Sequence, residues 1–229
     1  MANFDIKTSK PLNESKSGNF VFEPVDNICN VQIFENINTE SCGEMIARLS
    51  QIINQLPAKK ILTTSAQIIS PYDISPNTFV FDVIINAPGG DINTYRGIVS
   101  MFALAKSKGA IIRTQNIGYA ASCASLLAVQ GTPGYRVMFE HAYNLVHYGR
   151  DTVKGERDEE LKLASQQVAQ SREMLFSAYK KYTKLTDDEL SRYRTTENAG
   201  KLFAKKCLTK GLCDWILTSD GELIGRGGR

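Results

Sequence analysis

The sequence predicts an α/β domain with mainly parallel strands, followed by one long helix. First, apolar and β-branched segments at 79–86 and 110–114 alternate with segments whose apolar residues recur every three or four positions. Second, the chain of 229 residues is 42% hydrophobic, which is enough to bury a sizeable core. Third, an amphipathic stretch at roughly 156–182 would form a helix longer than the diameter of a small domain.

The individual elements follow from their apolar spacing and from the residues that end them. Helices end where proline or glycine follows the last apolar position, and short apolar runs between such breaks indicate strands. The predicted order is strand 31–34, helix 42–56, a long loop at 57–78, strand 79–86, a helix through 95–104, strand 110–114, a helix opening within 118–127, and strands 135–138 and 143–147.

The C-terminal third is expected to be organised differently. At 1.5 Å per residue, a helix over about 156–182 would be about 40 Å long, so we expect it to project and pack against another subunit. The alternative is a surface helix folded back on its own core. The predicted organisation is a head domain of residues 20–150 and 186–218, a helical segment at 151–185, and flexible ends at 1–19 and 219–229.

Composition excludes several classes of function. The formal net charge of +3 is too small to favour nucleic acid or an anionic membrane, and no apolar run approaches a membrane span. The start of the chain lacks a secretory signal, and the five cysteines include no CxxC pair, so we expect free thiols in the cytoplasm. With two histidines and no zinc-type spacing, neither a metal nor another cofactor is expected.

Two glycines follow the strand at 79–86. Gly89 and Gly90, in the run Ala-Pro-Gly-Gly that begins at Ala87, carry no side chain, so their backbone N–H groups can face a ligand. A tight turn between strand and helix would explain the same residues without a ligand. This motif alone leaves both interpretations open.

A serine lies among small residues at the next strand-to-helix junction. In Gly-Tyr-Ala-Ala-Ser-Cys, residues 118–123, a nucleophile at Ser122 would be close to the N–H donors of the following helix, which suit an oxyanion. The N–H of Cys123 is the natural donor. The alternative is that Ser122 only caps the helix. The order of residues is not the GxSxG nucleophile elbow.

His147 ends the predicted strand at 143–147 and is one of two histidines in the chain. An imidazole there can reach a neighbouring loop and take a proton from an alcohol. A hydrogen-bonded buried histidine is the alternative. His141 follows Glu140 in a polar turn and is expected at the surface.

Together these motifs resemble the proteolytic subunit of ATP-dependent Clp protease, the ClpP family. The resemblance covers about residues 30–217 and rests on five segments in order: Ala87-Pro88-Gly89-Gly90, Gly118-Tyr119-Ala120-Ala121-Ser122, Leu145-Val146-His147, the helix at 156–182 and Gly211-Leu212-Cys213-Asp214. It implies the Clp/crotonase fold, a ββα-superhelix head domain with a long projecting handle helix.

The same resemblance implies the roles of the site residues. Ser122 would be the nucleophile and His147 the general base, and the N–H groups of Gly90 and Cys123 would form the oxyanion hole. An extended peptide substrate would lie along the backbone at Gly89 and Gly90.

The sequence departs from the family pattern at the third catalytic residue, an aspartate after the handle helix. Counting back without gaps from Gly211 places this position on Ala199, and a small insertion would supply Glu197 or Asn198 instead. A glutamate can hold an imidazolium electrostatically, whereas an asparagine can only orient the ring. Glu197 is therefore the candidate and Asn198 the alternative; a solvated surface acid is the other interpretation of Glu197.

Other departures predict a divergent member of the family, either phage-encoded or specialised. The usual Met-Gly after the serine is Cys123-Ala124, and the usual Gln-Pro after the histidine is Tyr148-Gly149. The segment at 57–78 is also expanded.

The resemblance implies a cytoplasmic serine endopeptidase that hydrolyses peptide bonds of unfolded proteins inside a self-compartmentalised homo-oligomer of stacked rings. The chain has no P-loop, so an AAA+ unfoldase partner would supply ATP hydrolysis. Two alternatives stay open. One is a catalytically weak Clp-like structural subunit, which the missing aspartate suggests, and the other is a crotonase-type acyl-CoA enzyme.

Overall fold

A computed structural model describes residues 19–57, 70–147, 157–195 and 200–226 of the chain. One mixed sheet forms its centre, and the middle of the sheet is parallel. In spatial order its main path is β1 (Asn19–Val21), β2 (Ile28–Ile33), β3 (Val80–Ala87), β4 (Ile111–Ala121), β5 (Arg136–Phe139), β8 (Trp215–Leu217) and β9 (Leu223–Gly225), of which only the two end strands are antiparallel to their neighbours. The α/β class predicted from the sequence is therefore confirmed.

A short branch of the sheet begins where β4 passes β5. The first part of β4 pairs with β5, and its last residues pair in parallel with β6 (Tyr143–Leu145). β6 in turn pairs antiparallel with β7 (Lys201–Phe203). The sequence predicted a helix opening within 118–127, and a helix does begin there, at Cys123. Gly118–Ala121 before it continue β4 as strand, because β6 supplies them with a partner.

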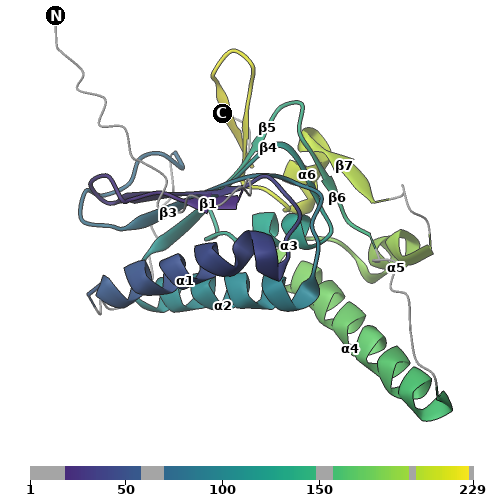
Figure 1. Ribbon diagram of the computed structural model, residues 1–229. Coiled ribbons are helices and arrows are strands. Elements are labelled where there is room, and N and C mark those ends of the chain that lie inside the picture. The colour runs from purple at the N-terminus through teal and green to yellow at the C-terminus, as the bar shows by residue number, and fades with distance from the viewer. Residues whose placement is uncertain (1–18, 58–69, 148–156, 196–199, 227–229) are drawn as a thin grey trace, which may run out of the picture.

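Three helices cover one face of the sheet (Figure 1): α1 (Thr39–Gln55), α2 (Ile92–Ser107) and α3 (Cys123–Val129). α1 begins at Asn38, whose side chain accepts a hydrogen bond from Ser41 N, and it buries Met45, Leu49, Ile52 and Ile53. Every residue of α3 is buried. The helix that follows Ser122 is therefore held on all sides by the core.

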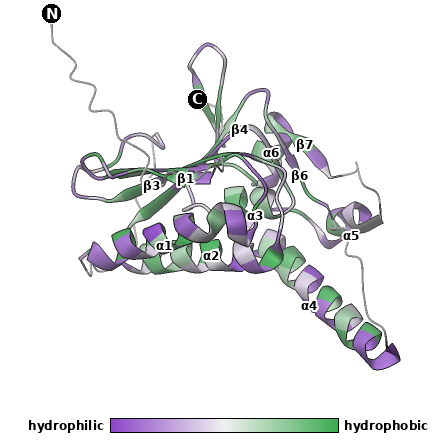
Figure 2. Cartoon of the chain, viewed as in Figure 1, coloured by the Kyte–Doolittle hydropathy of each residue, from purple (hydrophilic) through white to green (hydrophobic). Residues whose placement is uncertain are grey.

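The remaining helices follow β6 in the chain. α4 (Asp158–Tyr182) extends away from the sheet (Figure 1), whereas α5 (Asp187–Thr195) and α6 (Ala204–Lys210) are short. Only Phe176 and Tyr179 of α4 are buried, and Leu161 and Leu163 are exposed. Figure 2 shows hydrophilic and hydrophobic residues mixed along its length. The long helix predicted for 156–182 thus exists from Asp158 onward.

At the few positions of the predicted flexible ends that the structure describes, long-range contacts hold the chain. Asn19 begins β1 and is fully buried, and its side-chain oxygen accepts hydrogen bonds from Phe34 N and Glu35 N. At the other end, residues 223–225 form β9, and Arg226 donates to the carbonyl oxygen of Cys213. Long-range contacts fix these two segments, and local composition does not reveal such contacts. Residues 1–18 and 227–229 of the predicted ends lie outside the described residues.

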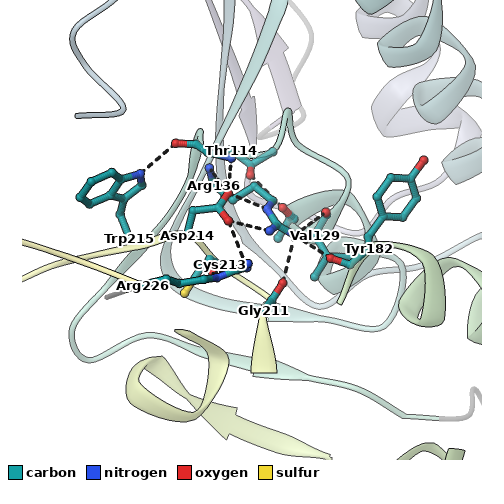
Figure 3. Close-up of polar contacts among 11 residues, drawn as sticks. Thr114, Val129, Arg136, Tyr182, Gly211, Cys213, Asp214, Trp215 and Arg226 are labelled. Carbon is teal, nitrogen blue, oxygen red and sulfur yellow. Dashed lines mark hydrogen bonds and ion pairs between the residues drawn. The ribbon is translucent and has the colours of Figure 1, made fainter. Parts of the chain in front are cut away.

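A buried ion pair fastens the C-terminal elements to the sheet (Figure 3). The Arg136 side chain donates to both carboxylate oxygens of Asp214, at 2.8 and 2.6 Å. Its Nη1 also donates to the carbonyl oxygens of Val129, Tyr182 and Gly211, which end α3, α4 and α6. One guanidinium group therefore links three helix ends to β5. Its bond to Tyr182 O anchors the C-terminal end of α4 in the core.

Within the described ranges, no helix is both long and apolar enough to cross a membrane. The same residues contain no group of three or more histidine, cysteine, aspartate or glutamate side chains that could hold a metal ion.

Candidate functional site

Ser122 lies between β4 and α3 with an unusual backbone conformation. Its φ is 53° and its ψ is −124°, although non-glycine residues rarely have positive φ. Its side chain makes no capping hydrogen bond to α3, so the interpretation of Ser122 as a simple helix cap is wrong. Backbone strain of this kind costs about 1–3 kcal/mol and is concentrated at functional sites.

The turn at Gly89 and Gly90 packs directly against this strained junction. A Cβ on Gly89 would lie 2.5 Å from Ala121 O and 2.8 Å from Ser122 Cβ, and the φ of Gly89 is +96°. Glycine is required here on both counts, because any side chain would collide with the serine and strain the backbone. The two glycine-rich motifs of the sequence are therefore brought together at the ends of β3 and β4.

Ile37 holds the other side of this turn. Its N–H donates to Gly89 O at 2.7 Å, and its carbonyl accepts from Asp91 N at 2.6 Å. In this parallel bridge, the polar groups of Gly90 itself point away from Ile37. The Cys123 thiol accordingly donates to Gly90 O at 3.3 Å, which places Gly90 beside the start of α3.

His147 follows the end of β6, the strand next to Ser122. Ala121 pairs with Leu145 in the β4–β6 register, and Ser122 N donates to Leu145 O at 3.0 Å. The half-buried His147 is thus two residues beyond the point where Ser122 is attached to β6. His141 is exposed, as predicted, and its Nε2 lies 3.2 Å from Ser219 Oγ.

The candidates for a third catalytic residue, Glu197 and Asn198, lie outside the described residues, as does Ala199. The chain is described again from Gly200, whose carbonyl accepts a hydrogen bond from Val146 N at 2.9 Å. A Cβ on Gly200 would lie 1.6 Å from Val146 O, so the backbones are in direct contact there. The described chain after the candidates therefore resumes next to the residue that precedes His147.

Sequence reasoning missed two residues that support the site. Ile37 gave no local signal, because a hydrophobic residue in a loop looks the same whether or not its backbone holds a distant turn. Asn86 at the end of β3 accepts a hydrogen bond from Tyr119 N at 3.1 Å. A Cβ on Gly118 would lie 2.5 Å from Asn86 Oδ1, so Gly118 was the signal of this close approach.

Cys123, next to the candidate nucleophile, is a buried free thiol. Burial raises its pKa to about 11, so the neutral form prevails at neutral pH. Burial likewise raises the pKa of Cys29 and of Cys207 to about 12 in each case, and it raises the pKa of Cys42 and Cys213. A cysteine nucleophile needs a thiolate, so the site favours the serine.

We predict that iodoacetamide leaves all five cysteines of the native protein unmodified at pH 7. The expected rate is lower than that of a free cysteine by on the order of 100-fold or more, because a raised pKa and burial both remove the reactive thiolate. Mass spectrometry before and after unfolding in urea measures this, with five adducts expected only after unfolding. Rapid native modification of Cys123 with loss of activity would contradict it.

The Clp protease family model matches residues 75–220, which is more than half of the chain. The chain belongs to the Clp protease family. The matched span contains the Gly89–Gly90 turn, Ser122, His147 and Asp214. Ile37, whose backbone bonds to the glycine turn, precedes the matched span.

The curated relatives that this Clp protease family member matches share low sequence identity with it. It is 30% identical over 140 residues to the ATP-dependent Clp protease proteolytic subunit of Mesostigma viride, a match that covers 61% of this chain and 58% of the relative. It is 27% identical to the Ostreococcus tauri subunit (68% of this chain, 74% of the relative) and 26% identical to subunit 2 of Streptomyces coelicolor (67% and 68%). The chain is therefore a divergent member of the family.

Proposed function

We propose that this Clp protease family member is a serine endopeptidase, with Ser122 as nucleophile and His147 as general base. One arrangement carries the proposal: the Gly89–Gly90 turn lies against Ser122, and the backbone of Ser122 is bonded to the strand that leads to His147. A nucleophile, a base and backbone donors are the parts that acyl transfer requires.

The proposed reaction begins when Ser122 Oγ attacks the carbonyl carbon of an extended peptide and its proton passes to His147. The N–H groups of Gly90 and Cys123 would stabilise the oxyanion, which is the largest single contribution in many such sites. His147 would then give its proton to the leaving amine as the peptide bond breaks. A water molecule, activated by the same histidine, would hydrolyse the acyl ester on Ser122.

Glu197 is the proposed third member, with Asn198 as the alternative. Either would contact the outer nitrogen of His147, and the carboxylate would also stabilise the imidazolium. The contact between Gly200 and Val146 supports this assignment, because Gly200 follows Glu197 by three positions and Asn198 by two, and Val146 directly precedes His147.

We propose α4 as the handle helix of a Clp/crotonase-type superhelix head domain. Its first half is exposed and carries Leu161 and Leu163, which a second copy of the chain would cover. Rings joined in this way would enclose the sites in a chamber, with unfolded polypeptides as substrates and an AAA+ unfoldase as partner. The curated relatives are named as subunits of an ATP-dependent protease, which supports that assignment.

The test is labelling of the purified, assembled protein with a fluorophosphonate, which reacts with activated serines. Wild type is expected to form one adduct per chain on Ser122, and Ser122→Ala is expected to form none. An assembled wild type that stays unlabelled would contradict the proposal and favour a catalytically weak structural subunit. Tight binding of an acyl-CoA thioester without peptidase activity would favour the crotonase-type alternative.

A further inference from the structure

The last carbonyl groups of α3, the helix that follows Ser122, accept hydrogen bonds from side chains of three other elements. Thr114 Oγ1 donates to Ala128 O at 2.8 Å, Arg136 Nη1 donates to Val129 O at 3.2 Å, and Lys106 Nζ donates to Gln130 O at 2.5 Å. A helix leaves its last carbonyls without partners of its own, so a buried helix end needs such donors. They come from β4, β5 and α2, and together they fix the C-terminal end of α3 in the core.

Gln130, the residue that ends α3, is bonded to α2 twice. Its backbone oxygen accepts the bond from Lys106, and its side-chain amide donates to the hydroxyl of Tyr95. Gln130 is 5% exposed and Tyr95 is 3% exposed, so water does not compete for this amide–hydroxyl bond. The backbone N–H of Gln130 donates to Leu126 O and Leu127 O, so the residue is part of the helix end. α2 therefore holds α3 by one backbone bond and one side-chain bond.

The ammonium group of Lys106 suits the carbonyl end of a helix, where the helix dipole favours a positive charge. Burial, together with the charges of Arg136 and Lys181, lowers the pKa of Lys106 to about 8. The group is therefore mostly charged at pH 7. With Arg136, it places two cations at the end of α3 that lies away from Ser122.

The opposite ends of α2 and α3 carry the two proposed oxyanion donors. Gly90 directly precedes Asp91, the N-cap of α2, and Cys123 is the first residue of α3. These two ends are neighbours, because Cys123 Sγ donates to Gly90 O at 3.3 Å. At 1.5 Å per residue α3 is only about 10 Å long, so a shift at its far end tilts the whole helix. The spacing of the two donors therefore depends on how α3 is held to α2.

We propose that Gln130 is a positioning residue for the oxyanion hole. By joining α3 to α2 through Tyr95 and Lys106, it sets the spacing of the two donor N–H groups. The inference rests on the proposed function, because it needs a reaction that passes through an oxyanion. Donors of this kind act only over a narrow range of distance, and a misplacement of about 1 Å can cost about 100-fold in rate.

The experiment compares Tyr95→Phe, Gln130→Met and the double variant with wild type, each as the assembled full chain. All three variants lose the amide–hydroxyl bond. We expect kcat for a fluorogenic peptide to fall by about 10- to 100-fold with KM unchanged, because the donors act on the transition state and not on the bound substrate. The affinity for a peptide boronate, which forms a tetrahedral adduct on an active serine, should fall by the same factor.

The double variant separates positioning from stability. Each single variant leaves one buried polar group unpaired, so its melting temperature should fall by about 2–12 °C. The double variant removes both polar groups and should regain most of that loss. Its kcat should nevertheless stay low, because the bond between α2 and α3 is still missing. A double variant that regains both its melting temperature and its kcat would overturn the inference.

Tyr72→Phe is the matched control, because Tyr72 also bonds its hydroxyl to a glutamine side chain. It donates to Gln115 Oε1 at 2.9 Å. Gln115 follows Thr114, whose side chain bonds α3, so the alternation of β4 puts Gln115 on the opposite face of the sheet. The control is expected to keep wild-type kcat and boronate affinity. An equal loss in the control would contradict a specific role for Gln130.

A wild type that neither cleaves peptides nor binds the boronate would contradict the proposed function instead. Crystal structures of wild type and the double variant then still test the role of Gln130. The distance between the backbone nitrogens of Gly90 and Cys123 is expected to differ by at least about 0.5 Å, the tolerance of a preorganised site. An unchanged distance would overturn the inference.

Discussion

If the proposed function holds, replacing His147 with alanine is expected to lower kcat for peptide hydrolysis by about 10⁴- to 10⁶-fold, as the loss of the general base does in a serine protease. A serine hydroxyl is a weak nucleophile until a base takes its proton during attack. The backbone donors at Gly90 and Cys123 would remain, so the residual rate should still exceed that of the uncatalysed reaction. Cleavage of a fluorogenic peptide by the assembled protein measures the effect.

The chain supplies its own control in His141→Ala. These are the two histidines of the sequence, and His141 lies exposed beside Ser219, away from the β4–β6 junction. The control is expected to retain wild-type kcat. Wild-type activity in both variants would mean that His147 is not the base. An equal loss of activity in both would point to a general effect of losing an imidazole. Unfolding curves of both variants show whether either change affects the fold.

Replacing Asp214 with alanine is expected to cost about 3–5 kcal/mol of unfolding free energy, the usual effect of leaving a buried charge without its partner. Arg136 is 5% exposed and would keep its charge, while Arg226, 3.0 Å from the same carboxylate, would add a second one. For a chain of this size, the melting temperature should fall by about 6–20 °C. Thermal and urea unfolding of the purified chain test this.

Asp220→Ala is the matched control, because Asp220 is an exposed acid in the turn between β8 and β9. It is expected to change the unfolding free energy by less than about 0.5 kcal/mol, as is usual for surface substitutions. A drop of similar size in both variants would show that the C-terminal strands, and not the ion pair, are sensitive to charge removal. An unchanged Asp214→Ala would mean that the Arg136 guanidinium finds solvent or another acceptor.

Much of the candidate site could be predicted because its signals are local. Small residues around Ser122 and the glycine pair after β3 indicate a close backbone approach wherever they occur, and the structure brings these two motifs into contact. The backbone strain at Ser122 could not be predicted, since nothing in the neighbouring residues requires a φ of 53°. It arises because the Ser122 N–H donates a hydrogen bond to Leu145 O of β6 immediately before α3 begins at Cys123.

By itself, the sequence determined the α/β class, the order of most elements and the membership of the Clp protease family, because periodicity and short motifs depend on residues close together in the chain. The tertiary structure alone decided the pairing of β1 and β9, the hold of Ile37 on the glycine turn, and the ion pair between Arg136 and Asp214. The last two join residues 52 and 78 positions apart (89 − 37 and 214 − 136), and a buried polar group finds such a partner only when the whole core has closed around it.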